Sequence, residues 1–263
     1  MPRRWRRGLY GGMVVVLFAA IAVWRFDLFS EALSVTLRQI RAGGPARWRV
    51  LAEAALLSGI LALTWRVLLV RADLAFDAIT AATAVCAGLA AEAWGTRFGL
   101  WTYYTGEKPP LWIIPAWPLG ALVVGRLGGW AERRWGGGLG AGAWRAGYWL
   151  LAGLALAASL AFLRPWLRLP SATAVLALMG ALLCARPAYR RDFWILAAGL
   201  LSVFLADAWG TTNGCWRYYT QKGGGGGLAA GISFGMAFDT VLVLGCLKLA
   251  AVFRTPESRP PGK

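Results

Sequence analysis

The chain contains no histidine, few charged residues and only four cysteines. The absence of histidine excludes a histidine-ligated metal centre, a histidine general base and a Ser-His-Asp triad. The cysteines form no CxxC pair, so neither a zinc motif nor a redox motif is predicted. Charged residues are 15% of 263 residues, against roughly a quarter in a soluble domain. We therefore expect no metal and no other cofactor, and we exclude an ordinary soluble enzyme.

Apolar residues make up 58% of the chain, which also contains 16 tryptophans. The net charge of +16 does not predict nucleic-acid binding, because the basic residues form short clusters between apolar runs. Such clusters are typical of the ends of membrane helices. They are Arg3, Arg4, Arg6 and Arg7, then Arg126, Arg133, Arg134 and Arg145, then Arg186, Arg190 and Arg191, and finally Lys248, Arg254, Arg259 and Lys263. We expect an integral membrane protein whose main partner is the lipid bilayer.

A membrane helix needs about 20 mainly apolar residues. The sequence predicts an all-α membrane bundle of about eight such helices, at residues 10–29, 50–70, 76–96, 111–131, 144–164, 170–187, 192–210 and 228–252. The first segment resembles a signal peptide at Ala20-Ile21-Ala22, but its apolar run continues to Trp24, which favours a retained helix. The short span at 170–187 and the span broken by Pro115 and Pro118 have the weakest signals.

Eight helices place both termini on the same side of the membrane. More basic residues fall on that side, so we expect both termini in the cytoplasm, in a bacterial or archaeal cytoplasmic membrane. Residues 31–49 oppose this rule with four arginines, and we interpret them as an amphipathic segment at the membrane interface.

The sequence contains an internal repeat. Residues 91–105 read AEAWGTRFGLWTYYT and residues 206–220 read ADAWGTTNGCWRYYT, which are identical at ten of fifteen positions. The same offset of 115 residues pairs Arg71 with Arg186 and Asp77 with Asp192. We therefore expect a tandem duplication of a four-helix unit, with copies at 1–131 and 144–253. The copies are joined by the glycine-rich linker 132–143 and followed by a basic tail at 254–263.

Each copy of the repeat places one carboxyl group, Glu92 or Asp207, in the last turn of an apolar helix. A carboxylate at membrane depth costs about 2.5–3.5 kcal/mol and is a functional candidate by default. An apolar environment favours the neutral form, so such a group can hold a proton and act as an acid. Nearby aromatic faces can stabilise a cation. This combination suits protonation of an alkene.

Structural interpretations of the same residues stay open. Tryptophan and tyrosine near helix ends form interfacial belts that have no catalytic role. Glu92 and Asp207 could pair with Arg97 or Arg217, or fix the shape of the loop. Further acidic residues lie elsewhere: we assign Asp77 and Asp192 to structural roles and Glu53 to the interface, and we treat Asp239 as a candidate second acid. The Gly223–Gly227 run predicts a flexible loop and not a phosphate site, because no Lys-Ser/Thr follows it.

The two copies differ after the repeated motif. Residues 109–118 read PPLWIIPAWP, and three of these prolines surround two tryptophans, Trp112 and Trp117. Prolines at these positions break and redirect a helix, which predicts an aromatic wall facing Glu92. The second copy has glycines and Ser233-Phe234-Gly235 there instead. The two copies therefore differ where a substrate would lie.

A carboxylate at a helix end, a nearby Gly, a Gly-x-aromatic-x-Tyr loop and a Pro/Trp-rich helix follow one another in this order. This arrangement resembles the integral-membrane carotenoid biosynthesis proteins, of the carotenoid hydratase type and more distantly the small lycopene cyclases. The resemblance covers about a quarter of the chain, chiefly Glu92–Pro118 and more weakly Asp207–Asp239. The cyclases' Pro-Leu-Glu-Glu type segment is replaced here by Pro115-Ala116-Trp117-Pro118, which favours hydration over ring closure.

The resemblance implies a long acyclic polyene substrate and acid-catalysed chemistry at a terminal double bond. It makes Glu92 the proton donor, with Asp207 or Asp239 as its partner. The aromatic residues of both motifs would line the substrate site: Trp94, Trp101, Tyr103, Tyr104, Trp112, Trp117, Trp209, Trp216, Tyr218 and Tyr219. Other enzymes of the same pathway would be further partners.

Two other functional classes stay open. A small-solute transporter would need ionisable groups near the middle of the membrane, where Asp239 is the main candidate. A non-catalytic scaffold or assembly protein would use the repeated motif only to fix loop geometry.

Overall fold

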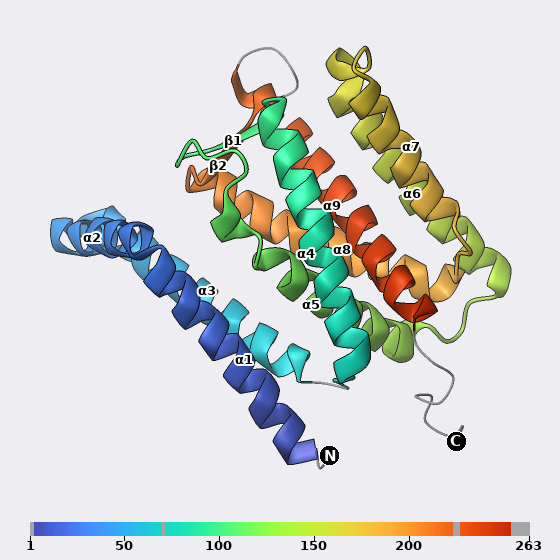
Figure 1. The fold of residues 1–263 in the computed structure, drawn as a ribbon, viewed down its shortest axis with the longest axis horizontal. Helices are drawn as coiled ribbons and strands as arrows, with labels where there is room; N and C mark the ends of the chain where they lie inside the picture. Colours follow the sequence, from blue (N-terminus) through green and yellow to red (C-terminus); the bar gives the residue numbers. More distant parts are fainter. Residues whose placement is uncertain (1–2, 70–71, 223–226, 254–263) are drawn as a thin grey trace. The chain divides into compact units, whose positions relative to one another are not determined.

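The computed structural model describes residues 3–69, 72–222 and 227–253, and these residues are almost entirely helical (Figure 1). They form two compact units, one within residues 1–72 and one within residues 73–263. The expected all-α fold is confirmed. Arg71, most of the Gly223–Gly227 run and the tail at 254–263 lie outside the described residues.

The described residues of the first unit form α1 (Arg3–Trp24), α2 (Phe26–Ala42) and α3 (Gly44–Leu68). No residue of α2 is buried, and its exposed apolar side chains include Phe26, Phe29 and Leu33. Asp27 lies in its first turn and Arg41 in its last, where each charge complements the helix dipole. α2 therefore covers much of the segment that the sequence places at the membrane interface.

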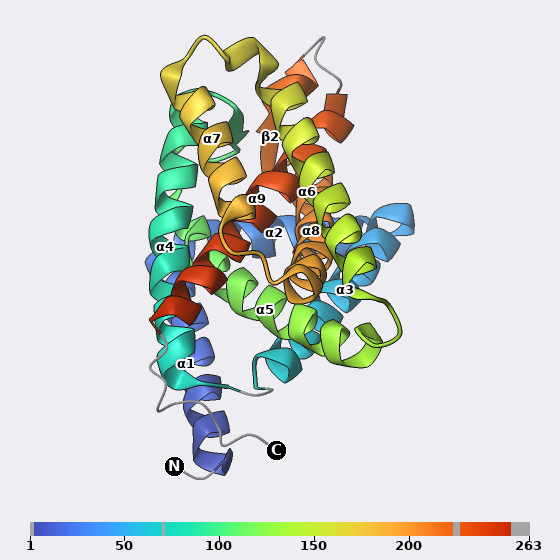
Figure 2. The same cartoon turned by 90° about the vertical axis from the view of Figure 1, so that its right-hand side faces the viewer.

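The second unit is built around α9. Its helices are α4 (Leu74–Arg97), α5 (Ala116–Trp135), α6 (Ala141–Leu163), α7 (Pro170–Cys184), α8 (Tyr189–Thr212) and α9 (Gly227–Val252), with short 3-10 turns at Leu111–Ile113, Arg164–Trp166 and Tyr219–Lys222. α9 contacts each of the other five helices and passes between them (Figure 2). Its only charged residues are Asp239 and Lys248, and most of its residues are buried, as expected of a helix in the middle of a bundle.

Six helices of the described chain are long and apolar enough to cross a membrane. They span Gly44–Leu68, Leu74–Arg97, Leu111–Trp135, Ala141–Trp166, Tyr189–Thr212 and Gly227–Val252. This supports an integral membrane protein in a lipid bilayer. Two of the eight expected spans, 10–29 and 170–187, are not among the six. α7 has 15 residues, about 22 Å of helix, which is shorter than the roughly 30 Å hydrocarbon core.

Two short strands join the ends of α4 and α8. β1 (Trp101–Tyr103) pairs antiparallel with β2 (Trp216–Tyr218), and Thr102 lies opposite Arg217. The turns before the two strands match, since Gly99 has φ +70 and Gly214 has φ +71. The sequence predicted only loops in both places. The strand pair brings the two repeated motifs together at one end of the second unit.

Asp77 and Asp192 form ion pairs at the end of the second unit that lies away from the two strands. Asp77 Oδ2 lies 2.6 Å from Nη2 of Arg126, and Asp192 Oδ2 lies 3.1 Å from Nζ of Lys248. Each carboxylate also accepts a hydrogen bond from a backbone N–H at the start of its own helix. These contacts agree with the structural roles expected for both residues. Glu53 pairs with Arg49 at the surface of α3.

The tight packing of Gly128 in α5 against Ile195 in α8 predicts a stability effect. A Cβ atom added at Gly128 would lie 2.9 Å from the Cα atom of Ile195, so Gly128→Leu must push the two helices apart. We expect a loss of about 1–3 kcal/mol in unfolding free energy. Gly153→Leu is the matched control, because nothing lies within 4 Å of an added Cβ there. Thermal unfolding in detergent measures both, and equal midpoints would contradict the packing.

Candidate active site

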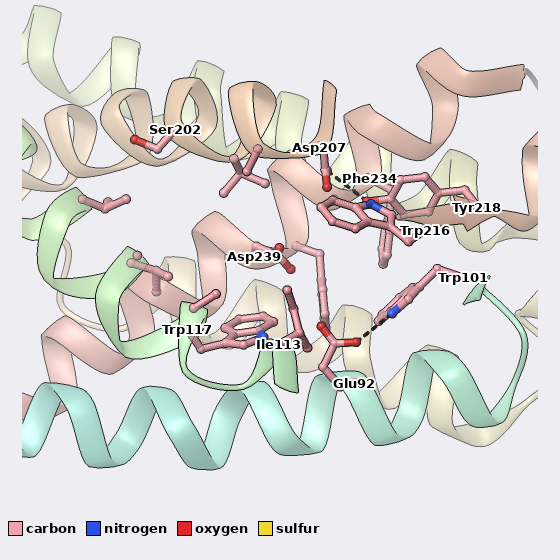
Figure 3. Close-up of a pocket in the computed structure, with 18 of the residues that line it drawn as sticks. Glu92, Trp101, Ile113, Trp117, Ser202, Asp207, Trp216, Tyr218, Phe234 and Asp239 are labelled. Carbon is pink, nitrogen blue, oxygen red and sulfur yellow. Dashed lines mark hydrogen bonds between the residues drawn. The ribbon is translucent and has the colours of Figure 1, made fainter. Parts of the chain in front are cut away.

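A cavity of about 200 Å³ lies in the second unit, beside the paired strands (Figure 3). Carboxyl groups, aromatic rings and small side chains line it together. The lining residues are Glu92, Trp101, Tyr103, Ile113, Ala116, Trp117, Gly120, Val124, Ser202, Val203, Ala206, Asp207, Trp216, Tyr218, Phe234, Gly235, Phe238, Asp239 and Val243. All three acids that the sequence singled out, Glu92, Asp207 and Asp239, therefore share one cavity.

Glu92 is held by aromatic hydrogen-bond donors from the strand that follows its own helix. The indole Nε1 of Trp101 donates to Oε2 at 2.9 Å, and the hydroxyl group of Tyr103 lies 3.1 Å from both carboxyl oxygens. Trp101 lies on one side of Glu92 and Trp117 on the other (Figure 3). Glu92 is only 5% exposed, so its position is fixed inside the protein.

Asp207 has the corresponding arrangement in the second motif. The Tyr218 hydroxyl group donates to Oδ2 at 2.9 Å, and Asp207 is also 5% exposed. Gly235 makes this pair possible, because a Cβ atom there would lie 2.1 Å from Oδ2 of Asp207 and 2.4 Å from the Tyr218 hydroxyl oxygen. The glycine that the sequence placed one helical turn before Asp239 therefore leaves room for the second acid.

Asp239 completes the group from α9. Its carboxyl group faces the cavity between Glu92 and Asp207 (Figure 3). No described residue donates a hydrogen bond to it or forms an ion pair with it, unlike the other two acids. It lies near the middle of a 26-residue helix.

No ion pair with any of the three acids is found among the described residues. Within the described ranges, neither arginine nor lysine forms an ion pair with Glu92 or Asp207. The alternative in which Arg97 or Arg217 pairs with these carboxyl groups is therefore not seen.

Close-packed rings form the wall around the acids. Phe234 and Phe238 of α9 are stacked with centroids 5.2 Å apart, and each ring lies 6.4 Å from that of Trp101. Burial, together with the neighbouring carboxyl groups, raises the pKa of Tyr103 and of Tyr218 well above the ordinary value for tyrosine. Both hydroxyl groups therefore stay neutral and remain hydrogen-bond donors.

Five of the ten expected aromatic residues line the cavity: Trp101, Tyr103, Trp117, Trp216 and Tyr218. The other five lie outside the lining. Trp94 packs behind Trp101 and Phe238, and Trp112 packs against Tyr103. The Tyr219 hydroxyl group donates to the backbone carbonyl of Phe162, Tyr104 is 54% exposed, and Trp209 is partly buried in α8.

Several lining residues were missed from the sequence. Ala116, Gly120 and Val124 recur every four residues on α5, and Phe234 and Phe238 share a face of α9. Residues three or four positions apart share a face of a helix, so this spacing was the signal in the sequence that could have placed them beside the acids. No group of three His, Cys, Asp or Glu side chains in the described ranges is arranged to hold a metal ion.

Comparison with known proteins does not place the chain in a family. No family model matches it, and neither a curated protein nor a solved structure shows significant similarity to it. The resemblance to carotenoid biosynthesis proteins therefore rests on the residues of the two motifs alone.

The hydrogen bond from Tyr103 predicts a measurable coupling. Tyr103→Phe removes the hydroxyl group that lies 3.1 Å from both carboxyl oxygens of Glu92, so we expect unfolding free energy to fall by about 1–3 kcal/mol. Tyr104→Phe is the matched control, because that ring is 54% exposed. If both variants unfold at the same temperature in detergent, the Tyr103 hydrogen bond does not hold the acid in place.

Proposed function

We propose that this protein is an integral-membrane enzyme that protonates a terminal double bond of a long acyclic isoprenoid, and that water captures the resulting cation. The observation that carries the proposal is the cavity itself. Glu92, Asp207 and Asp239 line one largely aromatic and aliphatic space, and no described cation neutralises them. An uncompensated carboxylate is costly in such surroundings, and the proposed reaction requires that Glu92 holds a proton before the substrate arrives.

The proposed reaction consumes one water molecule and returns the enzyme to its starting state. The double bond takes the proton of Glu92 at its less substituted carbon, which leaves a tertiary cation and the Glu92 carboxylate. The water oxygen then forms a bond to the cationic carbon. One proton of that water returns to a carboxylate, directly to Glu92 or by way of Asp239, so the enzyme gains and loses no net proton.

The cavity can stabilise the cation in two ways. Aromatic faces attract positive charge through the ring quadrupole, worth about 2 kcal/mol when water is excluded. Trp101 and Trp216 supply such faces beside the acids. The carboxylate left by proton transfer adds a direct electrostatic attraction. Asp239 lines the same cavity and has no partner among the residues that the structure describes, so it can bind the attacking water.

Hydration is favoured over ring closure within the proposal. The chain lacks the Pro-Leu-Glu-Glu type segment of the cyclases that it resembles, and has Pro115-Ala116-Trp117-Pro118 in its place. Water also has hydrogen-bonding partners in the cavity, since three carboxyl groups and two tyrosine hydroxyl groups line it.

We also propose that the fold arose by tandem duplication of a four-helix unit. The bounds of the elements support this: Leu74–Arg97, moved by 115 residues, coincides with Tyr189–Thr212. In the strand pair, Thr102 faces Arg217, its own counterpart at that offset, as a local twofold axis requires. Several cavity-lining residues are counterparts as well: Glu92 and Asp207, Trp101 and Trp216, Tyr103 and Tyr218, Gly120 and Gly235, and Val124 and Asp239.

We further propose that the chain crosses the membrane eight times and that both termini lie in the cytoplasm. α7 is then the counterpart of the second half of α3, and α1 crosses the membrane as the first span. Arg126 and Lys248 lie at the end of the second unit away from the strands, which is the cytoplasmic end by the charge rule. The cavity then lies nearer the opposite surface.

One observation favours a second candidate function. Asp239 is an acid near the middle of an apolar span and has no hydrogen-bond or ion-pair partner among the described residues, which is also what a route for protons or small cations requires. In that case ion flux into proteoliposomes would depend on Asp239, and polyenes would leave the protein unmodified.

The proton donor can be tested by one substitution. Glu92→Gln keeps the size of the side chain and can still accept from Trp101, but it cannot donate an acidic proton. We expect product formation from an acyclic polyene supplied in cells to fall below detection, with the protein still folded. Glu53→Gln, on the surface of α3, is the control and retains activity. Full activity in Glu92→Gln would remove this residue as the donor.

The fate of the cation can be tested with labelled water. Hydration predicts that product formed in H₂¹⁸O carries one ¹⁸O atom for each modified chain end, because the oxygen comes from the solvent. Mass spectrometry of the extracted pigment measures this. An unlabelled product with the mass of the substrate would instead indicate cyclisation.

A further inference from the structure

The cavity is not closed on all sides. Ala116 and Gly120 of α5 line it and are also exposed at the protein surface, and so is Ala206 of α8. Ser202 and Val203 of α8 line it and are partly exposed. Every one of these side chains is small, and Gly120 has nothing within 4 Å of the position of an added Cβ atom. The lining therefore reaches the surface between α5 and α8.

The packing of the two helices explains why the opening lies there. α5 and α8 are in tight contact where Gly128 meets Ile195. Gly120 lies two helical turns from that contact along α5, and Ser202 lies about two turns from it along α8, both towards the acids. Small side chains at these positions leave the space between the helices unfilled.

The opening lies in the middle parts of two helices that are long and apolar enough to cross a membrane. Ser202 is 13 residues after Tyr189, the first residue of the 24-residue helix α8, which is about 20 Å along roughly 36 Å of helix. Gly120 lies in the middle part of the Leu111–Trp135 span. A molecule passing between these residues comes from the lipid and not from water.

The volume of the cavity limits what can occupy it. About 200 Å³ is less than the roughly 300–1,000 Å³ typical of sites that enclose a whole small molecule. A long isoprenoid can therefore place only one end beside the acids, and the rest of the chain must remain outside. The opening between α5 and α8 provides the path for that remainder.

We infer that the cavity is entered sideways from the bilayer, between α5 and α8, by the acyclic end of a linear apolar chain. This deepens the proposed function and rests on it for the chemical step, but binding can be measured without turnover. Gly120, Ser202 and Ala206 then determine specificity, since their small side chains admit a thin chain and leave little width for a ring.

The test uses two polyenes of the same carbon number and a matched pair of variants. Lycopene has two acyclic ends, whereas β-carotene has a ring at each end. A polyene held in a chiral protein site shows induced circular dichroism in its visible band, and one dissolved in detergent does not. Gly120→Phe fills the opening. Gly153→Phe adds the same ring at an exposed glycine of α6 that likewise has nothing near its Cβ position.

The expected result is a signal with lycopene and none with β-carotene. Gly120→Phe should reduce the lycopene signal at least about tenfold, as should the second variant Ala206→Phe, whereas Gly153→Phe should keep it. Thermal unfolding verifies that each variant is folded. Equal lycopene signals in Gly120→Phe, Ala206→Phe and the unmodified protein would overturn the side entrance, and equal binding of β-carotene or no lycopene signal would overturn the substrate class.

Glu92→Gln separates this inference from the proposed function. If the entrance is correct, Glu92→Gln still binds lycopene, whatever its activity. If Glu92→Gln binds lycopene and also retains full activity, Glu92 is not the proton donor, but the side entrance is unaffected. Activity that survives in Gly120→Phe together with undiminished binding would contradict the entrance alone.

Discussion

The burial of Glu92 and Asp207 is the constraint on which the rest of this structure depends. Both carboxyl groups are withdrawn from water, and their partners are tyrosine and tryptophan donors instead of arginine or lysine. A salt bridge would keep each acid ionised and inert. Neutral donors orient the carboxyl group and favour its ionised form less than a guanidinium or ammonium group would, so proton transfer from each acid stays possible in the proposed reaction. The aromatic residues of the motif therefore position the acids, in addition to forming a wall.

This arrangement requires both copies of the motif at once. The β1–β2 pair joins the ends of α4 and α8, so that two acids far apart in the sequence share one cavity. The two copies differ at positions that line the cavity. Asp239 stands at the position that corresponds to Val124, and it adds a third acid on one side only. The Asp207–Tyr218 pair occupies the space beside Gly235, whereas the space beside Gly120 is open. The cavity therefore opens on the side of Gly120.

The sequence predicted the helical membrane fold and singled out the three acids that line one cavity, because apolar runs and isolated carboxyl groups are strong local signals. It could not predict the strand pair, because three-residue strands have no periodicity of their own and form only through contact between distant segments. For the same reason Trp94 and Trp209 were expected to face the substrate, although they pack elsewhere. Residues such as Gly120 and Ser202 contribute through the space they leave, which depends on the crossing of α5 and α8.

The central claim is that a carboxyl group of this cavity transfers its proton to a carbon atom. The most direct measurement is turnover of lycopene by the purified protein in lipid and D₂O, followed by mass spectrometry of the product. The account predicts one deuterium bound to carbon beside each newly formed C–O bond, and no such product from Glu92→Gln. A product without carbon-bound deuterium, or lycopene recovered unchanged from a protein that demonstrably binds it, would contradict the account.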